Sequence, residues 1–238
     1  MRITYLYHSG FCIQTKDFDI VIDFYKDSKD VDGILYKEIL PSSKKLYVLC
    51  THAHLDHYNG EILNWKSKEK DVTYIFSHDI QDAHLVDKDE AYFLDKFEEY
   101  KDQYISVKAY GSTDTGSSFY ILADGKTIFH AGDLNNWHWN EESNEEEVKE
   151  AERYYGEELS FVSNDIKTLD IAMFPIDNRL GQDFMKGAEQ FIEAITVKLM
   201  IPMHFDETYD KIALFEKEAK KHNTQYWAIK NKGESINI

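Results

Sequence analysis

The chain contains 238 residues, of which 42% are hydrophobic and only 3 are proline, a composition typical of a folded protein rather than a disordered tail. Its 27 Lys and Arg against 44 Asp and Glu give a formal net charge of −17, which opposes binding to nucleic acids and anionic membranes. Cys12 and Cys50 are the only cysteines, so a disulfide scaffold is excluded, and no stretch approaches the roughly 18 apolar residues that span a bilayer, so we expect a cytoplasmic protein without nucleic-acid or membrane partners.

Short strand-like runs dominate the first third of the chain. Alternation of apolar and polar residues, enriched in β-branched and aromatic types, favours extended backbone there. The predicted strands cover residues 2–8, 11–15, 18–23, 46–50 and 72–77. Helical spacing of apolar residues predicts helices at residues 61–66 and 90–100.

Strands and longer helices alternate in the rest of the chain. Strands are predicted at residues 104–108, 119–123, 127–131, 169–174, 199–202 and 226–229, with Asp124-Gly125 as a hairpin turn. Helices are predicted at residues 145–159, 183–196 and 207–221. Because no Pro/Gly/Ser-rich linker interrupts these elements, they predict one layered α/β domain over residues 1–238.

Four potential metal ligands follow the predicted strand at residues 46–50: His52, His54, Asp56 and His57. In extended backbone His52 and His54 point to one side, while the other two side chains can reach a second point at the following turn. Imidazole and carboxylate ligands favour Zn²⁺, with Mn²⁺ or Fe as alternatives, and a metal pair can deprotonate a bridging water near neutral pH. The segment predicts one or two such metals; the alternative is a solvated polar loop.

With this HxHxDH segment the chain resembles the metallo-β-lactamase superfamily. Further motifs follow in the family's order, namely His130-Ala131-Gly132-Asp133 and Ile201-Pro202-Met203-His204, each after a predicted strand. The resemblance implies a four-layer αββα sandwich with metals at one rim between two sheets. It also implies that Asp133 bridges two metals, that His204 completes the second site, and that Asp56 and Asp133 are the catalytic carboxylates.

Two weaker matches resemble the branch of ascorbate-phosphate lactonase-like enzymes. They are His8-Ser9-Gly10-Phe11 and Ile20-Val21-Ile22-Asp23. The chain also departs from the family, which supplies a third histidine from the loop at residues 109–116, where this sequence has Ser112 and Asp114. Three outcomes are open: Asp114 ligates the metal in place of the histidine, a water fills the position, or the first of the two predicted metal sites binds its metal weakly. The alternative for Asp114 is that it is an ordinary turn residue.

Three further residues are candidates for substrate binding. His8 ends a strand near the predicted rim, and His138 lies in an aromatic segment just past Asp133 that could form a pocket wall. Arg179 follows the predicted strand at residues 169–174 and would favour a carboxylate or phosphate group. A structural histidine, loop packing and a surface salt bridge are the respective alternatives.

Together these features predict a metal-dependent hydrolase. A metal-bound hydroxide would attack an ester-like carbon or phosphorus of a small anionic substrate, such as a lactone, phosphoester or thioester. One alternative is a noncatalytic metal-binding or sensor protein of the same fold, which the missing histidine favours. A nuclease is a weaker alternative because the sequence supplies no basic track. The sequence does not determine the oligomeric state.

Overall fold

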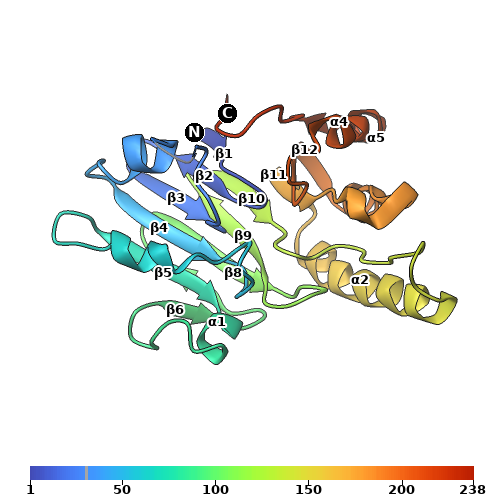
Figure 1. Cartoon of the computed structure of the whole chain (residues 1–238), viewed down its shortest axis with the longest axis horizontal. Coiled ribbons are helices and arrows are strands. Elements are labelled where there is room, and N and C mark those ends of the chain that lie inside the picture. Colours follow the sequence, from blue (N-terminus) through green and yellow to red (C-terminus); the bar gives the residue numbers. More distant parts are fainter. Residues whose placement is uncertain (30–31) are drawn as a thin grey trace.

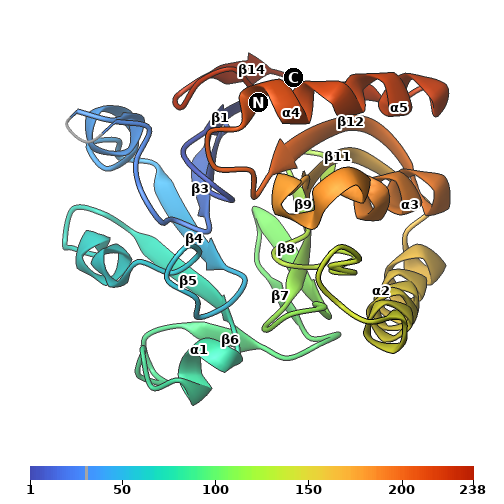
Figure 2. The ribbon, with the colours of Figure 1, turned by 45° about the vertical axis from the view of Figure 1, so that its right-hand side comes forward.

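Two seven-stranded β-sheets face each other, and helices cover the outer face of each (Figure 1 and Figure 2). The computed structural model describes residues 1–29 and 32–238. This is the four-layer αββα sandwich that the resemblance implied, so the predicted fold class is confirmed. Within the described residues, no helix combines the length and the apolar character needed to cross a lipid bilayer.

The first sheet is built from the N-terminal half of the chain and one strand from the C-terminal end. β1 to β3 pair antiparallel, β3 to β6 pair in parallel, and β14 lies antiparallel beside β1. Across the sheet the strands are β14 (Ser235–Asn237), β1 (Arg2–Tyr5), β2 (Phe11–Gln14), β3 (Phe18–Ile22), β4 (Lys45–Cys50), β5 (Val72–Ser77) and β6 (Tyr92–Leu94).

The second sheet repeats this pattern of antiparallel strands followed by parallel ones. β7 to β10 pair antiparallel, and β10 to β13 pair in parallel. Across the sheet the strands are β13 (Gln225–Tyr226), β12 (Thr196–Met203), β11 (Thr168–Pro175), β10 (Lys126–His130), β9 (Ser118–Ala123), β8 (Ile105–Tyr110) and β7 (Glu99–Lys101). The predicted turn at Asp124-Gly125 joins β9 to β10, with both residues at positive φ (50° and 70°) as a two-residue hairpin requires.

Burial on both faces explains why β4 reads as a continuous apolar run. Tyr47 and Leu49 pack into the core between the sheets, whereas Val48 and Cys50 pack into a second core under the outer helices. Successive side chains of a strand point to opposite faces, so a strand in the middle of four layers must be apolar throughout. The strand that leads into the HxHxDH segment is therefore held from both sides.

The helices fall into two sets, one on each sheet. Short elements cover the first sheet, whereas the set on the second sheet includes two longer helices of 21 and 9 residues. The first set comprises η1 (Leu35–Ile39), η2 (Gly60–Trp65) and α1 (Asp79–Asp82), and the second comprises α2 (Glu145–Asp165), η3 (Asn178–Asp183), α3 (Lys186–Ala194), α4 (Tyr209–Ile212), η4 (Ala213–Phe215) and α5 (Glu216–Lys221). Asn144 caps α2 reciprocally with Glu147, and three glutamates in its first turn suit the positive end of the helix dipole.

Three of the predicted helices differ from the structure. The predicted helix at 90–100 is wrong, because β6 and β7 occupy this segment as edge strands of the two sheets. Its Glu, Ala, Leu and Lys residues favour a helix locally, but pairing with β5 and β8 prevails. The predicted helix at 207–221 is interrupted by η4, and residue 196 begins β12 instead of ending a helix.

Candidate metal centre

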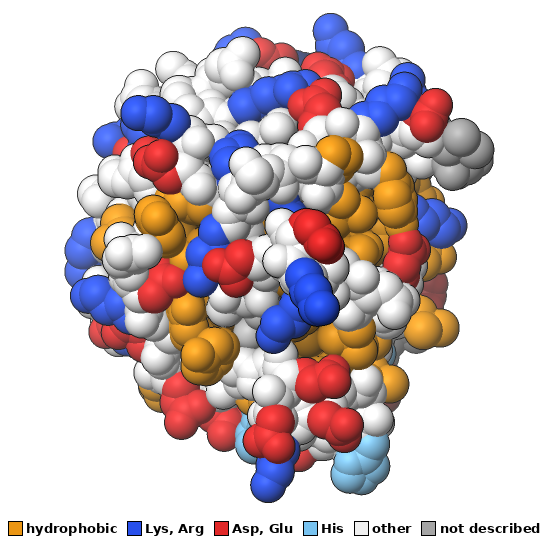
Figure 3. Space-filling view, turned by 90° about the vertical axis from the view of Figure 1, so that its left-hand side faces the viewer, with side chains coloured by type: hydrophobic (Ala, Val, Ile, Leu, Met, Phe, Trp, Pro, Cys, Tyr) orange, Lys and Arg blue, Asp and Glu red, His pale blue; other side chains and the backbone are white. Residues whose placement is uncertain are grey.

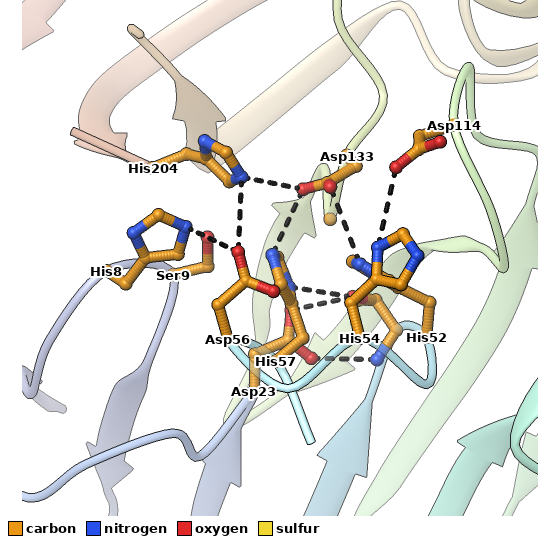
Figure 4. Close-up of polar contacts among 12 residues, drawn as sticks. His8, Ser9, Asp23, His52, His54, Asp56, His57, Asp114, Asp133 and His204 are labelled. Carbon is orange, nitrogen blue, oxygen red and sulfur yellow. Dashed lines mark hydrogen bonds and ion pairs between the residues drawn. The ribbon is translucent and has the colours of Figure 1, made fainter. Parts of the chain in front are cut away.

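The candidate ligands meet at the rim where the parallel strands of both sheets end (Figure 4). β4 leads directly into the loop at residues 51–57, β10 leads to Asp133, and β12 leads to His204. The ligand atoms of these side chains form groups whose members lie within 4.8 Å of one another. Segments far apart in the sequence thus supply neighbouring imidazole and carboxylate groups.

Asp133 lies between two groups of histidines. Its Oδ2 is 3.4 Å from Nε2 of His52, and its Oδ1 is 3.1 Å from Nε2 of His57 and 3.4 Å from Nε2 of His204. The two carboxylate oxygens thus face different sets of ligands. This is the geometry of a residue that can bridge two cations.

The first group contains His52, His54, Asp114 and Asp133. Oδ2 of Asp114 lies 3.5 Å from Nδ1 of His54, and both side chains are about half exposed. Ser112 is buried, and its hydroxyl accepts a hydrogen bond from the backbone N–H of Asp114 (3.3 Å). The structure therefore brings Asp114, rather than Ser112, to the position near the first group.

The second group contains Asp56, His57 and His204, together with His8. Nε2 of His8 lies 3.2 Å from Oδ2 of Asp56, and Nε2 of His204 lies 4.0 Å from the same oxygen. Three of these side chains are buried, and Asp56 is half-buried. His8 thus points at the second group, inside the rim.

Carboxylates behind the histidines fix the orientation of the rings. Asp23, which follows β3, accepts a hydrogen bond from Nδ1 of His57 (2.7 Å), and Asp177, which follows β11, accepts one from Nδ1 of His204 (3.0 Å). Thr51 holds Asp23 in turn, through its N–H and its hydroxyl (both 2.7 Å). Because Nδ1 of each ring is hydrogen-bonded to a carboxylate, Nε2 is directed toward the group, where loss of its proton would leave a lone pair for a metal.

The charges in this centre are strongly coupled. Burial raises the pKa of Asp133, but the positive charges of His57 and His204 outweigh this and hold it well below its usual range. Burial lowers the pKa of His57, but Asp133 and Asp23 outweigh it and raise that pKa to about 10. Burial with the neighbouring His57 lowers the pKa of His52 to about 3, so this ring is neutral at pH 7.

Several buried polar atoms of the centre have no hydrogen-bond partner among the described residues. They include Nε2 of His52 and of His57 and Oδ1 of Asp133; the last two are 3.1 Å apart but are not aligned as donor and acceptor. Buried polar atoms left unpaired cost free energy, and such atoms are uncommon in folded proteins. Since these atoms converge, and since imidazole and carboxylate suit Zn²⁺, Mn²⁺ and Fe, the residues present fit a divalent metal.

A cavity of about 450 Å³ opens over the centre. It is lined on one side by His54, Asp56, Asp114, Asp133 and His204, and on the other by Thr113, Trp137, Trp139 and Arg179. The two tryptophan rings stack at 6.1 Å, and the guanidinium of Arg179 lies 6.0 Å from the ring centre of Trp139. Arg179 is also held by Asp177, whose carboxylate oxygens accept hydrogen bonds from its Nε (3.0 and 2.9 Å).

His138 lies outside this cavity, unlike the tryptophans on either side. It is buried, its Nδ1 accepts a hydrogen bond from the backbone N–H of Asn140 (3.2 Å), and its Nε2 lies 3.3 Å from the carbonyl of Asp183. These contacts are those of a ring that packs its own loop. His130 likewise donates from Nε2 to the carbonyl of Ser9 (2.9 Å) rather than to a candidate ligand.

Sequence reasoning did not single out the outer carboxylates, among them Asp23 and Asp177. Asp79 is a third, and it accepts a hydrogen bond from the N–H of Ala53 (2.8 Å) inside the HxHxDH loop. Their shared signal is visible in the sequence: each lies one or two residues beyond a strand whose carboxyl end reaches the rim. That signal acquires meaning only when the strands are known to be neighbours.

Comparison with known proteins places these observations in a wider context. A family model described as a Beta-lactamase superfamily domain matches residues 2–150. A UPF0173 metal-dependent hydrolase of Nanoarchaeum equitans is 25% identical over 257 aligned positions that cover all of both chains.

Two solved structures share the fold. The metallo hydrolase Igni18 of Ignicoccus hospitalis aligns with a TM-score of 0.71 at 18% identity, over 99% of this chain and 97% of that one. CmlA of Streptomyces venezuelae, a diiron β-hydroxylase, aligns with a TM-score of 0.68 at 10% identity; all of this chain is covered, and 54% of CmlA. At these identities the likeness concerns the fold.

Proposed function

The chain belongs to the β-lactamase superfamily, and from that membership we propose that it is a metal-dependent hydrolase formed as one domain. Its metal centre would lie at the rim between the two sheets. The proposed ligands are His52, His54, Asp56, His57, Asp114, Asp133 and His204.

The observation that carries this proposal is the position of Asp133. Its two oxygens face two separate sets of imidazoles, and one of them is buried without a hydrogen bond among the described residues. An ion pair between Asp133 and one histidine would not explain why unpaired ligand atoms converge on its carboxylate from both sides. Two cations bridged by Asp133 would satisfy them.

Bound divalent metals supply Lewis acidity and lower the pKa of water, which makes hydrolysis possible near neutral pH. The residues of the chain position the ligands. Asp23 and Asp177 fix the rings of His57 and His204, so the ligands need little reorganisation when the substrate arrives. Asp56 lines the cavity, where its carboxylate would face a bound substrate.

We propose that the substrate is small and carries an anionic group. A cavity of about 450 Å³ suits a small molecule, and Arg179 is the one cationic side chain among the described residues that line it. Asp177 and Trp139 hold the guanidinium at the cavity wall, where it can pair with a carboxylate or phosphate. The tryptophan rings would cover the apolar part of an ester, lactone or thioester.

A nuclease is not favoured by the charges of the molecule. On the face shown in Figure 3, basic and acidic side chains are intermixed rather than gathered in a basic track. The formal net charge of −17 likewise opposes binding of a nucleic acid. A noncatalytic metal-binding protein is the second candidate, because the first group relies on two half-exposed side chains, His54 and Asp114.

Elemental analysis combined with a hydrolysis panel tests the proposal. The protein is loaded with Zn²⁺, Mn²⁺ or Fe²⁺ and assayed on a lactone, a phosphomonoester, a phosphodiester and a thioester. We expect one or two metals per chain and turnover of at least one compound. Metal without turnover on any compound would favour the noncatalytic candidate, and no metal above background would exclude both.

Asp133→Ala should lose metal and activity together, because it removes the carboxylate whose two oxygens face the two sets of ligands. We expect a loss of metal affinity of at least about 100-fold. The matched control is Asp87→Ala, which removes an exposed carboxylate on a surface turn. Full turnover by the Asp133 variant on a substrate of the parent would contradict the assignment.

A further inference from the structure

We propose that His8 is an additional ligand of the metal held by Asp56, His57 and His204. The inference rests on the proposed function, because it assumes a metal in the second group. His8 comes from the turn between β1 and β2, outside the sequence motif that supplies the other candidates. It would raise the number of protein ligands of this metal, including Asp133, from four to five.

The first observation is the direction of the His8 ring. Its Nε2 lies 3.2 Å from Oδ2 of Asp56, and the ring centre is 4.1 Å from that of His204 and 5.7 Å from that of His57. The ligand atoms of these four residues lie within 4.8 Å of one another (Figure 4). Nε2 is buried and makes no hydrogen bond to any described residue, although Asp56 is close.

The second observation is the carboxylate behind the ring. Nδ1 of His8 donates a hydrogen bond to Oδ1 of Asp206 (2.9 Å), just as Nδ1 of His57 donates to Asp23 and Nδ1 of His204 donates to Asp177. All three rings therefore have the same arrangement, with Nδ1 hydrogen-bonded to a carboxylate and Nε2 directed toward the second group. This arrangement is the usual support of metal-ligating histidines.

The third observation is the rigidity of the turn that carries His8. His8 adopts a left-handed conformation (φ 56°), and its carbonyl accepts a hydrogen bond from the backbone N–H of His204 (3.1 Å). The carbonyl of Ser9 accepts one from Nε2 of His130. A Cβ on Gly10 would lie 2.9 Å from the carbonyl oxygen of Asp23, so the turn approaches the strand end closely. Backbone strain held by such contacts is typical of functional positions.

The buried histidines outside the centre provide the contrast. Both ring nitrogens of His130 and of His138 lie within hydrogen-bonding distance of backbone groups, so neither ring has a free lone pair. Among buried histidines, Nε2 atoms without partners in the described part of the chain occur at His8, His52 and His57. The last two are candidate ligands on sequence grounds as well, and His8 shares their environment.

The test uses the full-length protein and Co²⁺, whose visible absorption reports ligand number and geometry. His8→Asn removes the imidazole with a residue that tolerates positive φ. We expect the affinity of the site in the second group to fall about 100-fold and its spectrum to change. Asp206→Asn keeps the ring but weakens its orientation, and we expect a fall of about tenfold with the spectrum retained. His222→Ala, an exposed histidine, should change neither.

A direct measurement covers the case in which His8→Asn fails to fold. In the wild-type protein labelled with ¹⁵N-histidine, Nε2 of His8 should shift on addition of Zn²⁺. An unshifted Nε2, or a His8→Asn variant with the affinity and spectrum of the parent, would overturn the assignment of His8 while the wild type still binds metal. A wild-type protein that binds neither metal would overturn the proposed function as well.

Discussion

At the scale of single residues, Asp114 would complete the proposed first metal site. It lies 3.5 Å from His54 and is half exposed, so its oxygen can turn to a metal at little cost. We expect Asp114→Ala to weaken the first site about tenfold and to leave the second unchanged, because the second group does not contain this residue. A two-site titration with Zn²⁺ against a chromophoric chelator measures both affinities.

Asp114→Asn is the matched control, since it keeps the shape of the side chain and removes its charge. It should weaken the first site by less than the alanine variant does. Ser112→His should not create a ligand, because Ser112 is 5% exposed and a larger side chain at a buried position would have to displace its neighbours. Two equally tight sites whose metal affinities do not change in the Asp114 variants would show that this residue is an ordinary turn residue.

The histidines of the centre could be predicted from sequence because four ligands of the HxHxDH segment are close in the chain. The orienting carboxylates could not. Asp23 is bonded to His57, and Asp206 to His8, across separations of 34 and 198 residues. Aspartate is common in this acidic chain, so nothing local distinguishes Asp23 and Asp206 from the other aspartates until the strands are placed side by side.

At the scale of elements, Asp170 joins the three parallel strands whose ends carry Asp133, Asp177 and His204. It lies on β11, accepts hydrogen bonds from the N–H and hydroxyl of Thr127 on β10, and pairs with Lys198 on β12 (2.8 Å). The bonds from Lys198 and Thr127 lower its pKa to about 2. The charged form therefore stabilises the alignment of these strands.

The sign of the pH dependence follows from that lowered pKa. The contribution of Asp170 is complete above its ordinary pKa of 3.8 and is lost as the pH falls toward about 2. Asp170→Asn should lower the free energy of unfolding by about 1–2 kcal/mol at pH 6, allowing for partial exposure. In urea titrations of the metal-free proteins, the difference should shrink at pH 3. A difference independent of pH would contradict a role for the charge.

Elements buried on both faces were the ones that the sequence predicted best. The predicted bounds of β4 and β5 lie within one residue of the observed ones, because continuous apolar runs of this length must be buried on both faces. β6 and β7 were missed because edge strands bury little, and local helix preference was then the stronger signal. The orientation of the two sheets came from the family resemblance rather than from any pattern of residues.

At the scale of the whole molecule, the proposed metal centre would connect the two sheets. His57 and Asp56 follow a strand of the first sheet, and Asp133 and His204 follow strands of the second. Metal binding should therefore stabilise the folded chain, by about 2.7 kcal/mol at a free metal concentration 100 times Kd. For a chain of this length we expect the Tm to rise by about 5–10 °C. Calorimetry with Zn²⁺ and with EDTA measures the shift.

Asp133→Ala provides the control for that experiment, because its Tm should hardly respond to Zn²⁺. Hydrogen exchange adds the location of the effect. On removal of metal, amides in the loops after β4, β10 and β12 should exchange faster, whereas those in the middle of β11 should not. Uniform acceleration throughout both sheets would indicate general destabilisation rather than loss of a link at the rim.

The position of β14 has a consequence for how the chain is made. Its three residues pair with Arg2, Ile3 and Thr4, so a strand that is synthesised after β2 to β13 covers the edge of β1. Until then β1 presents an open edge, and open strand edges promote association between nascent chains. The other strands of the first sheet can thus pair early in synthesis, but protection of the β1 edge from neighbours on the same polysome requires that β14 has been made.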